Sequence, residues 1–253
     1  MGGRVALVTG VSRRAGIGFA IARRLTAAGM RVFAQHHVPH DAERPWGADP
    51  DGIEAVIAAI GGDVRHAGVD LSRADAPAAL FSAARDAFGH VDVLVCNHAS
   101  SSPDGALATV TAEMLDEHWA VNTRSSILLA REFAHHHDGR IGGRIVLMTS
   151  GQNRGPMPGE VAYATSKGAL AAITATLADE LADRGITVNC VNPGPTDTGW
   201  ATPALFDAVR DRLPMGRWGE PDDAARLIAW LVSDEGRWMT GQVLDSEGGF
   251  RRR

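Results

Sequence analysis

The 253-residue sequence has only two cysteines, no excess of positive charge and no long apolar run. Cys96 and Cys190 each end an apolar run typical of a buried strand, which suits reduced thiols inside a core. Neither cysteine has metal-ligand spacing to other residues, so no metal site is expected. A formal net charge of −5 disfavours a nucleic-acid partner.

The N-terminal segment MGGRVALVTG has too short an apolar stretch for a signal peptide or a membrane span. No membrane partner is therefore expected, and a cytoplasmic location follows by default. The composition, 45% hydrophobic and 22% charged, is that of a globular protein, and no Pro/Ser/Gly-rich linker divides the chain. The sequence thus predicts a single domain over residues 1–253.

Two clusters of basic residues have ordinary explanations. The histidines His135, His136 and His137 close a helical pattern, where they favour the helix dipole and need no metal. The three final arginines, 251–253, follow a Gly-Gly turn and are interpreted as a solvated terminus.

Short runs of valine, isoleucine and leucine alternate with longer helical patterns, which indicates βαβ units. The sequence predicts an α/β fold with a doubly wound, parallel, seven-stranded sheet and helices on both faces. The expected strands are Arg4–Val8, Arg31–Ala34, Val64–Val69, Val91–Cys96, Arg144–Met148, Ile186–Val191 and Gln242–Asp245. The expected helices are Gly18–Ala28, Gly52–Ile60, Pro77–Phe88, Ala112–His137, Val161–Arg184 and Asp222–Val232, and His36–Asp51 is expected to be a long surface loop.

The only tyrosine, Tyr163, precedes Lys167 by four positions in a helical pattern. Positions i and i+4 share one face of a helix, so the phenol and the ammonium can enter the same pocket. A nearby positive charge stabilises phenolate and lowers its pKa from near 10. The pair is therefore a candidate acid/base centre.

The first expected strand leads directly into a glycine-rich turn, from Thr9-Gly10 to Gly16-Ile17-Gly18, and then into a helix. Glycines here let the backbone approach a pyrophosphate, whose charge the amide N–H groups and the positive helix end can hold. This context favours dinucleotide binding.

Together these motifs resemble the short-chain dehydrogenase/reductase family, in the branch of 3-oxoacyl-carrier-protein reductases and related carbonyl reductases. The resemblance covers essentially the whole length and implies a Rossmann-type dinucleotide-binding and catalytic domain. Tyr163 and Lys167 match the family's Tyr-x-x-x-Lys, Ser150 its catalytic serine and Asn122 its helix asparagine. Further landmarks match at Asn192-Pro193-Gly194, Gly216-Arg217, Gly219-Glu220-Pro221, Gly241-Gln242 and Gly248-Gly249.

The resemblance implies a role for each member of this set. Ser150 would hydrogen-bond the substrate carbonyl, and Tyr163 would pass its proton to the developing alkoxide. Lys167 would lower the phenol pKa and hold the nicotinamide ribose, while Asn122 would position a water. The residues expected to bind the cofactor are Gly10, Ser12, Arg13, Arg14, Gly16, Ile17, Gly18, His36, His37, Asp70, Leu71, Asn97, His98, Ala99, Tyr163, Lys167, Pro193, Gly194, Thr196 and Thr198.

Two segments depart from the family pattern. The glycine-rich turn has five residues, Val11 to Ala15, where relatives have three. After the fourth strand, His98 and Ser100 place polar side chains where the ribose or the substrate would lie. His98 is either an extra donor or a filler with a satisfied imidazole, and the filler is favoured because proton transfer is already assigned.

NADP is expected as the cofactor, with NAD as the alternative. The second strand ends Ala34-Gln35-His36-His37, without the acidic residue that normally accepts hydrogen bonds from the ribose 2′-OH in NAD enzymes. Arg13 and Arg14 in the expanded turn offer guanidinium groups to a 2′-phosphate. Against this, Asp41 and Glu43 could fold back to the ribose.

The sequence therefore predicts NADPH-dependent reduction of a ketone to a secondary alcohol, with a 3-oxoacyl thioester or a related small carbonyl compound as substrate. Segment 195–215, which contains Trp200 and Phe206, is expected to cover the substrate. The resemblance also implies a homotetramer formed by helices 112–137 and 161–184. One alternative is a non-catalytic cofactor-binding scaffold. An enoyl reductase is ranked lower, because the resemblance to that group implies a wider spacing between the tyrosine and the lysine than the four residues found here.

Overall fold

A computed structural model describes residues 2–252 and contains a seven-stranded sheet in which every neighbouring pair is parallel. The strand order is β3-β2-β1-β4-β5-β6-β7, so the direction of winding reverses between β1 and β4. This confirms the predicted doubly wound architecture. The strands are β1 (Val5–Val8), β2 (Arg31–His36), β3 (Val64–Gly68), β4 (Val93–Cys96), β5 (Gly143–Met148), β6 (Ile186–Asn192) and β7 (Val243–Asp245).

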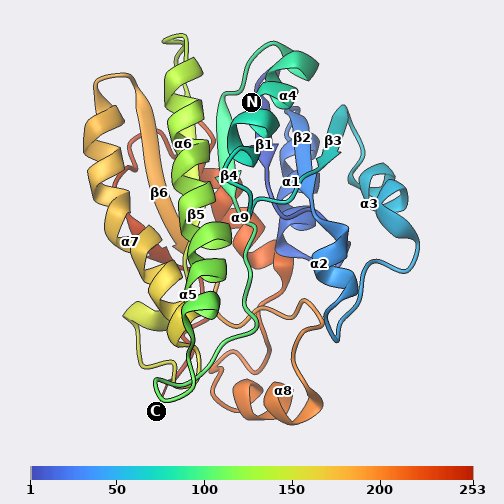
Figure 1. The fold of residues 1–253 in the computed structure, drawn as a ribbon. Coiled ribbons are helices and arrows are strands. Elements are labelled where there is room, and N and C mark those ends of the chain that lie inside the picture. Colours follow the sequence, from blue (N-terminus) through green and yellow to red (C-terminus); the bar gives the residue numbers. More distant parts are fainter. Residues whose placement is uncertain (1, 253) are drawn as a thin grey trace.

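Helices cover both faces of the sheet (Figure 1). They are α1 (Ile17–Ala27), α2 (Val38–Ala42), α3 (Gly52–Ile60), α4 (Ala76–Phe88), α5 (Ala112–His118), α6 (Ser125–His136), α7 (Val161–Ala182), α8 (Pro203–Arg210) and α9 (Pro221–Leu231), with a π-helical turn η1 (Trp119–Arg124) and a 3₁₀ turn η2 (Gly151–Asn153). Within residues 2–252, no helix is long and apolar enough to cross a membrane.

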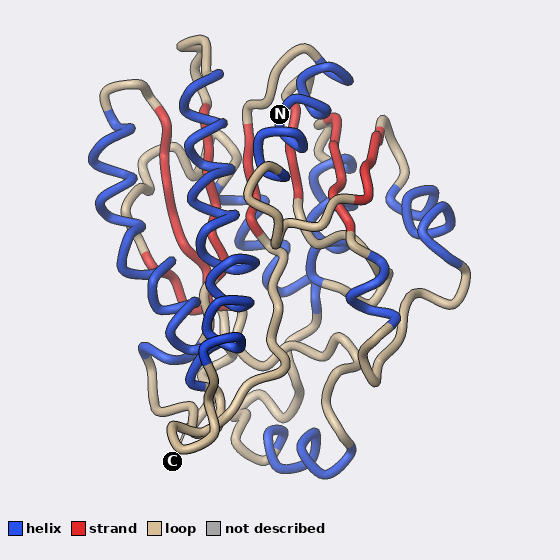
Figure 2. The backbone as a smooth tube through the Cα atoms, viewed as in Figure 1, coloured by secondary structure: helices blue, strands red, loops and turns tan. Residues whose placement is uncertain are grey.

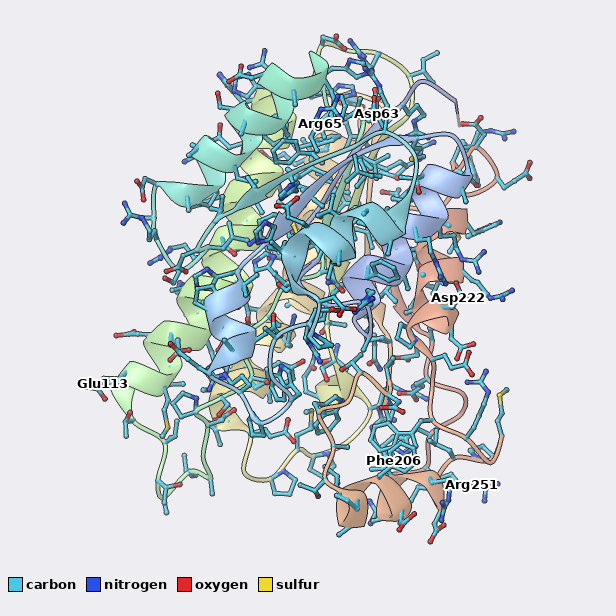
Figure 3. The ribbon with its side chains drawn as sticks, turned by 90° about the vertical axis from the view of Figure 1, so that its right-hand side faces the viewer. Asp63, Arg65, Glu113, Phe206, Asp222 and Arg251 are labelled. Carbon is cyan, nitrogen blue, oxygen red and sulfur yellow. The ribbon has the colours of Figure 1, made fainter. Side chains whose placement is uncertain are left out.

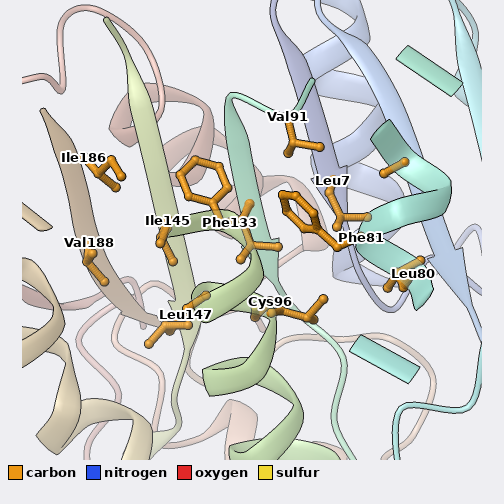
Figure 4. Packing of buried hydrophobic residues seen from close by; sticks show 14 of the residues in the cluster. Leu7, Leu80, Phe81, Val91, Cys96, Phe133, Ile145, Leu147, Ile186 and Val188 are labelled. Atoms are coloured by element: carbon orange, nitrogen blue, oxygen red, sulfur yellow. The ribbon is translucent and has the colours of Figure 1, made fainter. Parts of the chain in front are cut away.

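Successive side chains of each strand point to opposite faces of the sheet, so the core consists of two layers. Val5 and Leu7 of β1 face a cluster with α4, α6 and α7, whereas Ala6 and Val8 face α1, α3 and α9. Figure 4 shows the first layer, where Phe81 of α4 meets Phe133 of α6 edge-to-face at 6.4 Å between ring centroids. Fully burying each such ring contributes about 1.5–3 kcal/mol, so this layer fixes α6, and through it η1, against the sheet.

Three segments differ from the predicted elements. The second strand continues to His36, and the long loop after it contains α2. The single helix expected over Ala112–His137 is interrupted by η1, where Asn122 hydrogen-bonds across to the loop after β4. Segment 195–215 contains α8, whose N-cap Thr202 accepts a hydrogen bond from the Leu205 amide.

Because all strands are parallel, their carboxyl ends meet at one edge of the sheet. In Figure 2 this is the lower edge, where long loops gather around α8. The glycine-rich turn after β1, the loops after β4 and β5, and residues 193–202 after β6 all lie there. The fold therefore brings the predicted site residues to the place where open α/β sheets bind ligands.

Candidate active site

The four expected catalytic residues come from three neighbouring elements. Ser150 follows β5, Tyr163 lies in the first turn of α7 and Lys167 in its second, and Asn122 belongs to η1. The Ser150 hydroxyl lies beside the Tyr163 phenol, where it favours the ionised form of the phenol. The Lys167 Nζ lies 5.9 Å from the centre of the Tyr163 ring. The i, i+4 spacing thus places both groups on one helix face beside the serine.

Asp104, a residue outside the predicted set, caps the start of α7. Its carboxylate oxygens accept hydrogen bonds from the amides of Ala162, at 2.9 Å, and Tyr163, at 2.8 Å. These amides belong to the first helical turn, whose N–H groups have no partner inside the helix. Asp104 therefore fixes the backbone of Tyr163 from the loop after β4.

His118 packs against the other side of this tyrosine. The His118 ring meets the Tyr163 ring nearly at right angles, with 6.3 Å between centroids. His118 is fully buried, and because the Met114 carbonyl lies 2.8 Å from Nδ1, that nitrogen carries the proton. The imidazole is a rigid wall that limits rotation of the phenol.

Burial shifts the pKa of both Tyr163 and Lys167. It raises the pKa of Tyr163 to about 12, although the Ser150 hydroxyl opposes this shift. Burial also lowers the pKa of Lys167 to about 8. The expected lowering of the phenol pKa by Lys167 is therefore not found in the chain itself, because the ammonium is turned to the Met148 carbonyl at 3.0 Å.

Asn122 is buried and joins three segments. Its Oδ1 accepts from the Ser100 amide at 2.7 Å, and its Nδ2 donates to the Ser100 carbonyl and to Ser166 Oγ, each at 2.9 Å. Ser166 Oγ in turn donates to the carbonyl of Tyr163 at 2.8 Å. Since both N–H groups of the amide are used within the protein, a role in holding a water would fall to its other atoms.

The glycine-rich turn fits a phosphate-bearing cofactor. A Cβ on Gly18 would overlap the Gly10 carbonyl oxygen, and one on Gly10, whose φ is +75°, would lie 2.8 Å from Asn97 Nδ2. Only glycine permits this close backbone approach. Helix α1 begins at Ile17 with no side-chain cap and no acidic residue in its first turn, so its positive end is available to an anion.

Two amide side chains hold the turn in place. Gln35 accepts from the Gly10 amide at 2.9 Å and donates to the Val69 carbonyl at 2.7 Å. Asn97 Nδ2 donates to the Thr9 carbonyl at 3.0 Å. The turn is therefore preorganised by the strands on both sides of β1, which reduces the entropy lost when a ligand binds.

His98 connects two segments of the protein through hydrogen bonds. Its Nε2 lies 2.9 Å from the Val121 carbonyl, so this nitrogen carries the proton, and Nδ1 accepts from Thr9 Oγ1 at 2.6 Å. Burial, reinforced by the charge of Lys167, lowers the pKa of His98 to about 3. These contacts favour the filler interpretation, in which the ring stays neutral and joins the turn after β1 to η1.

Both arginines of the expanded turn pair with carboxylates of the long loop. Arg13 lies 3.1 Å from Asp41, with its guanidinium 5.7 Å from the centre of the Trp46 ring. Arg14 forms a two-point contact with Asp49 and a further ion pair with Asp51, and the bond to Arg14 lowers the pKa of Asp49 to about 2.

The remaining expected cofactor residues lie in the turn after β1 or near the ends of β2, β3, β4 and β6. His36 is buried, where desolvation lowers its pKa, and the His37 amide donates to Ser12 Oγ at 3.3 Å. Asp70 accepts from the Ser72 amide at 2.9 Å. The other positions, Gly16, Leu71, Ala99, Pro193, Gly194, Thr196 and Thr198, lie in the turn after β1 or directly after β3, β4 and β6.

The two basic clusters differ in their environment. His136 stacks on Phe81 and His137 on Phe133, so these rings extend the core. Within residues 2–252, no group of three or more His, Cys, Asp or Glu side chains is placed to hold a metal ion. The interpretation of the tail as solvated is wrong for Arg252, because its guanidinium pairs with the buried Glu247.

Sequence reasoning missed several residues that shape the site: Gln35, Asp49, Asp51, Asp104, His118, Glu247 and Arg252. A glutamine directly after an expected apolar strand was the one visible signal, because an amide that is buried there needs partners. The others act across long sequence separations. Asp104, for example, caps a helix that begins more than fifty positions later, and no local pattern marks such a partner.

The fold and the arrangement of the site residues are typical of dinucleotide-binding oxidoreductases. A family model described as "Enoyl-(Acyl carrier protein) reductase" matches residues 10–251. An uncharacterized oxidoreductase, YjdA, from Bacillus subtilis is 45% identical over 98% of this chain and 97% of its own length. An NADPH-dependent aldehyde reductase-like protein from Arabidopsis thaliana is 36% identical over 99% and 95%.

A solved structure gives the same result. A short-chain dehydrogenase from Burkholderia cenocepacia, in complex with NADP, superposes with a TM-score of 0.86 at 37% identity, covering 98% of each chain. The chain belongs to the short-chain dehydrogenase/reductase family.

Proposed function

We propose that this oxidoreductase uses NADPH to reduce a ketone to a secondary alcohol. The observation that carries the proposal is the grouping of Ser150, Tyr163 and Lys167 at the carboxyl edge of the sheet, beside a turn that fits a phosphate-bearing cofactor. The cofactor supplies the hydride when bound. The reductases and the NADP complex among the similar proteins support this assignment.

The side chains have separate tasks in this reaction. The Ser150 hydroxyl donates to the carbonyl oxygen and stabilises the charge that develops there. Tyr163, protonated because its pKa is raised to about 12, is the proton donor to the same oxygen. Asp104 and His118 hold the tyrosine in place. A 3-oxoacyl thioester is one candidate substrate, and the enoyl reductase alternative is ranked lower because Tyr163 and Lys167 are only four positions apart.

Segment 195–215 is proposed to cover the substrate. Its helix α8 rests on the buried Trp218, which stacks on Phe206 at 4.9 Å between centroids and meets Trp200 at 5.9 Å. This aromatic group would give the substrate pocket an apolar wall while leaving Leu205 exposed on the helix.

The homotetramer stays a prediction, and light scattering at micromolar concentration tests it.

The proposed activity is tested by NADPH consumption with β-ketoacyl thioesters, cyclic ketones, quinones and sugar-like ketones. We expect turnover of at least one ketone class, with a secondary alcohol as the product. A matched enoyl thioester distinguishes the enoyl reductase alternative. Cofactor binding without turnover of any compound would instead favour the scaffold alternative.

We expect the chain to prefer NADPH, and Arg13→Ala to lower kcat/KM for NADPH about tenfold or more while affecting NADH little. A charge-assisted hydrogen bond to phosphate has about this strength. Arg14 is held by two acids, so Arg14→Ala should change the preference less.

Asp41→Asn provides the reciprocal control for coenzyme preference. Asp41 pairs with Arg13, so removing its negative charge should favour NADPH further. Steady-state kinetics with both cofactors measure each variant. If the parent prefers NADH, or if neither arginine variant lowers kcat/KM for NADPH, NADP is refuted as the coenzyme. The reductase assignment would still stand.

A further inference from the structure

The C-terminal tail lies against the loop that follows the catalytic serine. A Cβ on Gly151 would lie 2.5 Å from the Arg252 guanidinium, and one on Gly155 would lie 2.6 Å from Arg252 Cδ. The two glycines therefore leave the space that this arginine side chain fills. Arg252 is only 15% exposed, and Gly151, which its guanidinium approaches, directly follows Ser150 in the sequence.

The tail is held in this position by several bonds. Arg252 donates to Glu247 Oε1 at 3.0 Å, and the Glu247 carboxylate also accepts from Asn192 Nδ2 at 3.1 Å. The Arg251 amide donates to the Arg212 carbonyl at 3.0 Å, which joins the tail to the segment after α8. Burial raises the pKa of Glu247, but its bonds to Arg252 and Asn192 more than offset this, so the carboxylate stays charged.

A cavity of about 330 Å³ opens beside this tail, and its lining is basic. The lining residues are Arg154, Phe250, Arg251 and Arg252, which we call the arginine pocket. Two acids oppose these three charges: Glu247 pairs with Arg252, and Asp245 lies 3.4 Å from Arg154. Among residues 2–252, the Arg251 guanidinium has no ion-pair or hydrogen-bond partner.

We propose that the arginine pocket binds an oxyanion, a carboxylate or a phosphate, carried by the carbonyl substrate. This inference rests on the proposed reductase function and narrows its substrate class to anionic ketones. Arg251 supplies the unpaired charge, and a guanidinium fork suits the geometry of either oxyanion. Phe250 gives the same pocket an apolar side for the carbon chain that joins the anion to the carbonyl.

Two matched substrate pairs test this proposal. Levulinate is compared with methyl levulinate, and dihydroxyacetone phosphate with dihydroxyacetone, using NADPH and the parent enzyme. We expect kcat/KM to be about tenfold or more higher for the anionic member of at least one pair, mainly through KM. Which pair shows the preference identifies carboxylate or phosphate.

Two variants assign the preference to the pocket. Arg251→Gln should lower the anion-to-neutral ratio of kcat/KM at least about fivefold. Arg65→Gln, a matched change at the far end of the molecule (Figure 3), should leave that ratio unchanged. Higher salt should reduce the ratio in the parent, since the contact lies at the surface.

Two sets of results would contradict the proposal, and they differ in what they leave standing. If kcat/KM is equal for the anionic and the neutral member of both pairs, or if the anion-to-neutral ratio of kcat/KM is the same in Arg251→Gln and the parent, the arginine pocket does not bind the substrate, while the reductase assignment stands. Turnover of none of the four compounds, together with failure of the wider ketone screen, would overturn the reductase assignment and this proposal with it.

Discussion

Tyr163→Phe is expected to lower kcat at least about 10²-fold, the lower end for loss of a general acid. The change removes only the phenol hydroxyl, which lies beside Ser150. The ring keeps its contact with His118, and Asp104 still caps the helix, because both contacts involve the ring or the backbone. NADP(H) affinity and the melting temperature should therefore remain close to those of the parent. Kinetics, cofactor titration and thermal melting measure the three quantities.

The single tyrosine allows ionisation of the proposed general acid to be observed directly. Phenolate absorbance in the ultraviolet can come only from Tyr163, and the Phe variant provides a blank. In the chain without ligand we expect phenolate to form only near pH 12, because burial raises the pKa. A Phe variant that keeps most of its activity, or a phenol that titrates near its ordinary pKa of 10, would contradict this account.

The fold could be predicted because its signals are local. Apolar runs alternating with helical patterns indicate parallel strands, and each expected strand is present with its ends shifted by at most two residues. The spacing of Tyr163 and Lys167 needed only the helical repeat to place both on one face.

The features that the sequence did not predict depend on contacts between distant parts of the chain. The π-helical turn at Asn122 arises where Ser100 and Ser166 bind its side chain, and neither is close in sequence. The lowered phenol pKa was expected from spacing alone, but spacing does not report how far burial removes water from the phenol. The tail arginines look solvated until Glu247 and the glycines after Ser150 are brought beside them.

Lys167→Met is expected to make the protein much less active and more stable at neutral pH. Lys167 is 2% exposed, its one hydrogen bond goes to the Met148 carbonyl, and no carboxylate lies within ion-pair distance among the described residues. Burying an unpaired ammonium costs free energy, which methionine of similar length avoids. We expect kcat to fall at least about 10²-fold. The expected rise in Tm is about 2–4 °C, which corresponds to about 1 kcal/mol at this chain length.

The gain should depend on pH in a defined direction. The pKa of Lys167 is about 8 in the folded protein, against an ordinary value of 10.5. Between these values the unfolded chain binds more protons at this position, so the parent's free energy of unfolding rises with pH. Below about pH 8 both states are charged and the whole cost of burial is present. The advantage of the Met variant is therefore largest near neutral pH and declines toward pH 10.5.

Two measurements separate this prediction from a general effect of mutation. Lys167→Arg keeps a charge at the same place and should give no gain in stability. Because Lys167 is the only lysine in the sequence, NMR of protein labelled at lysine reports its pKa without assignment. A pKa near the ordinary value, or a Met variant less stable than the parent at every pH, would show that the protein holds this ammonium without cost. The trade between stability and catalysis at this position would then be absent.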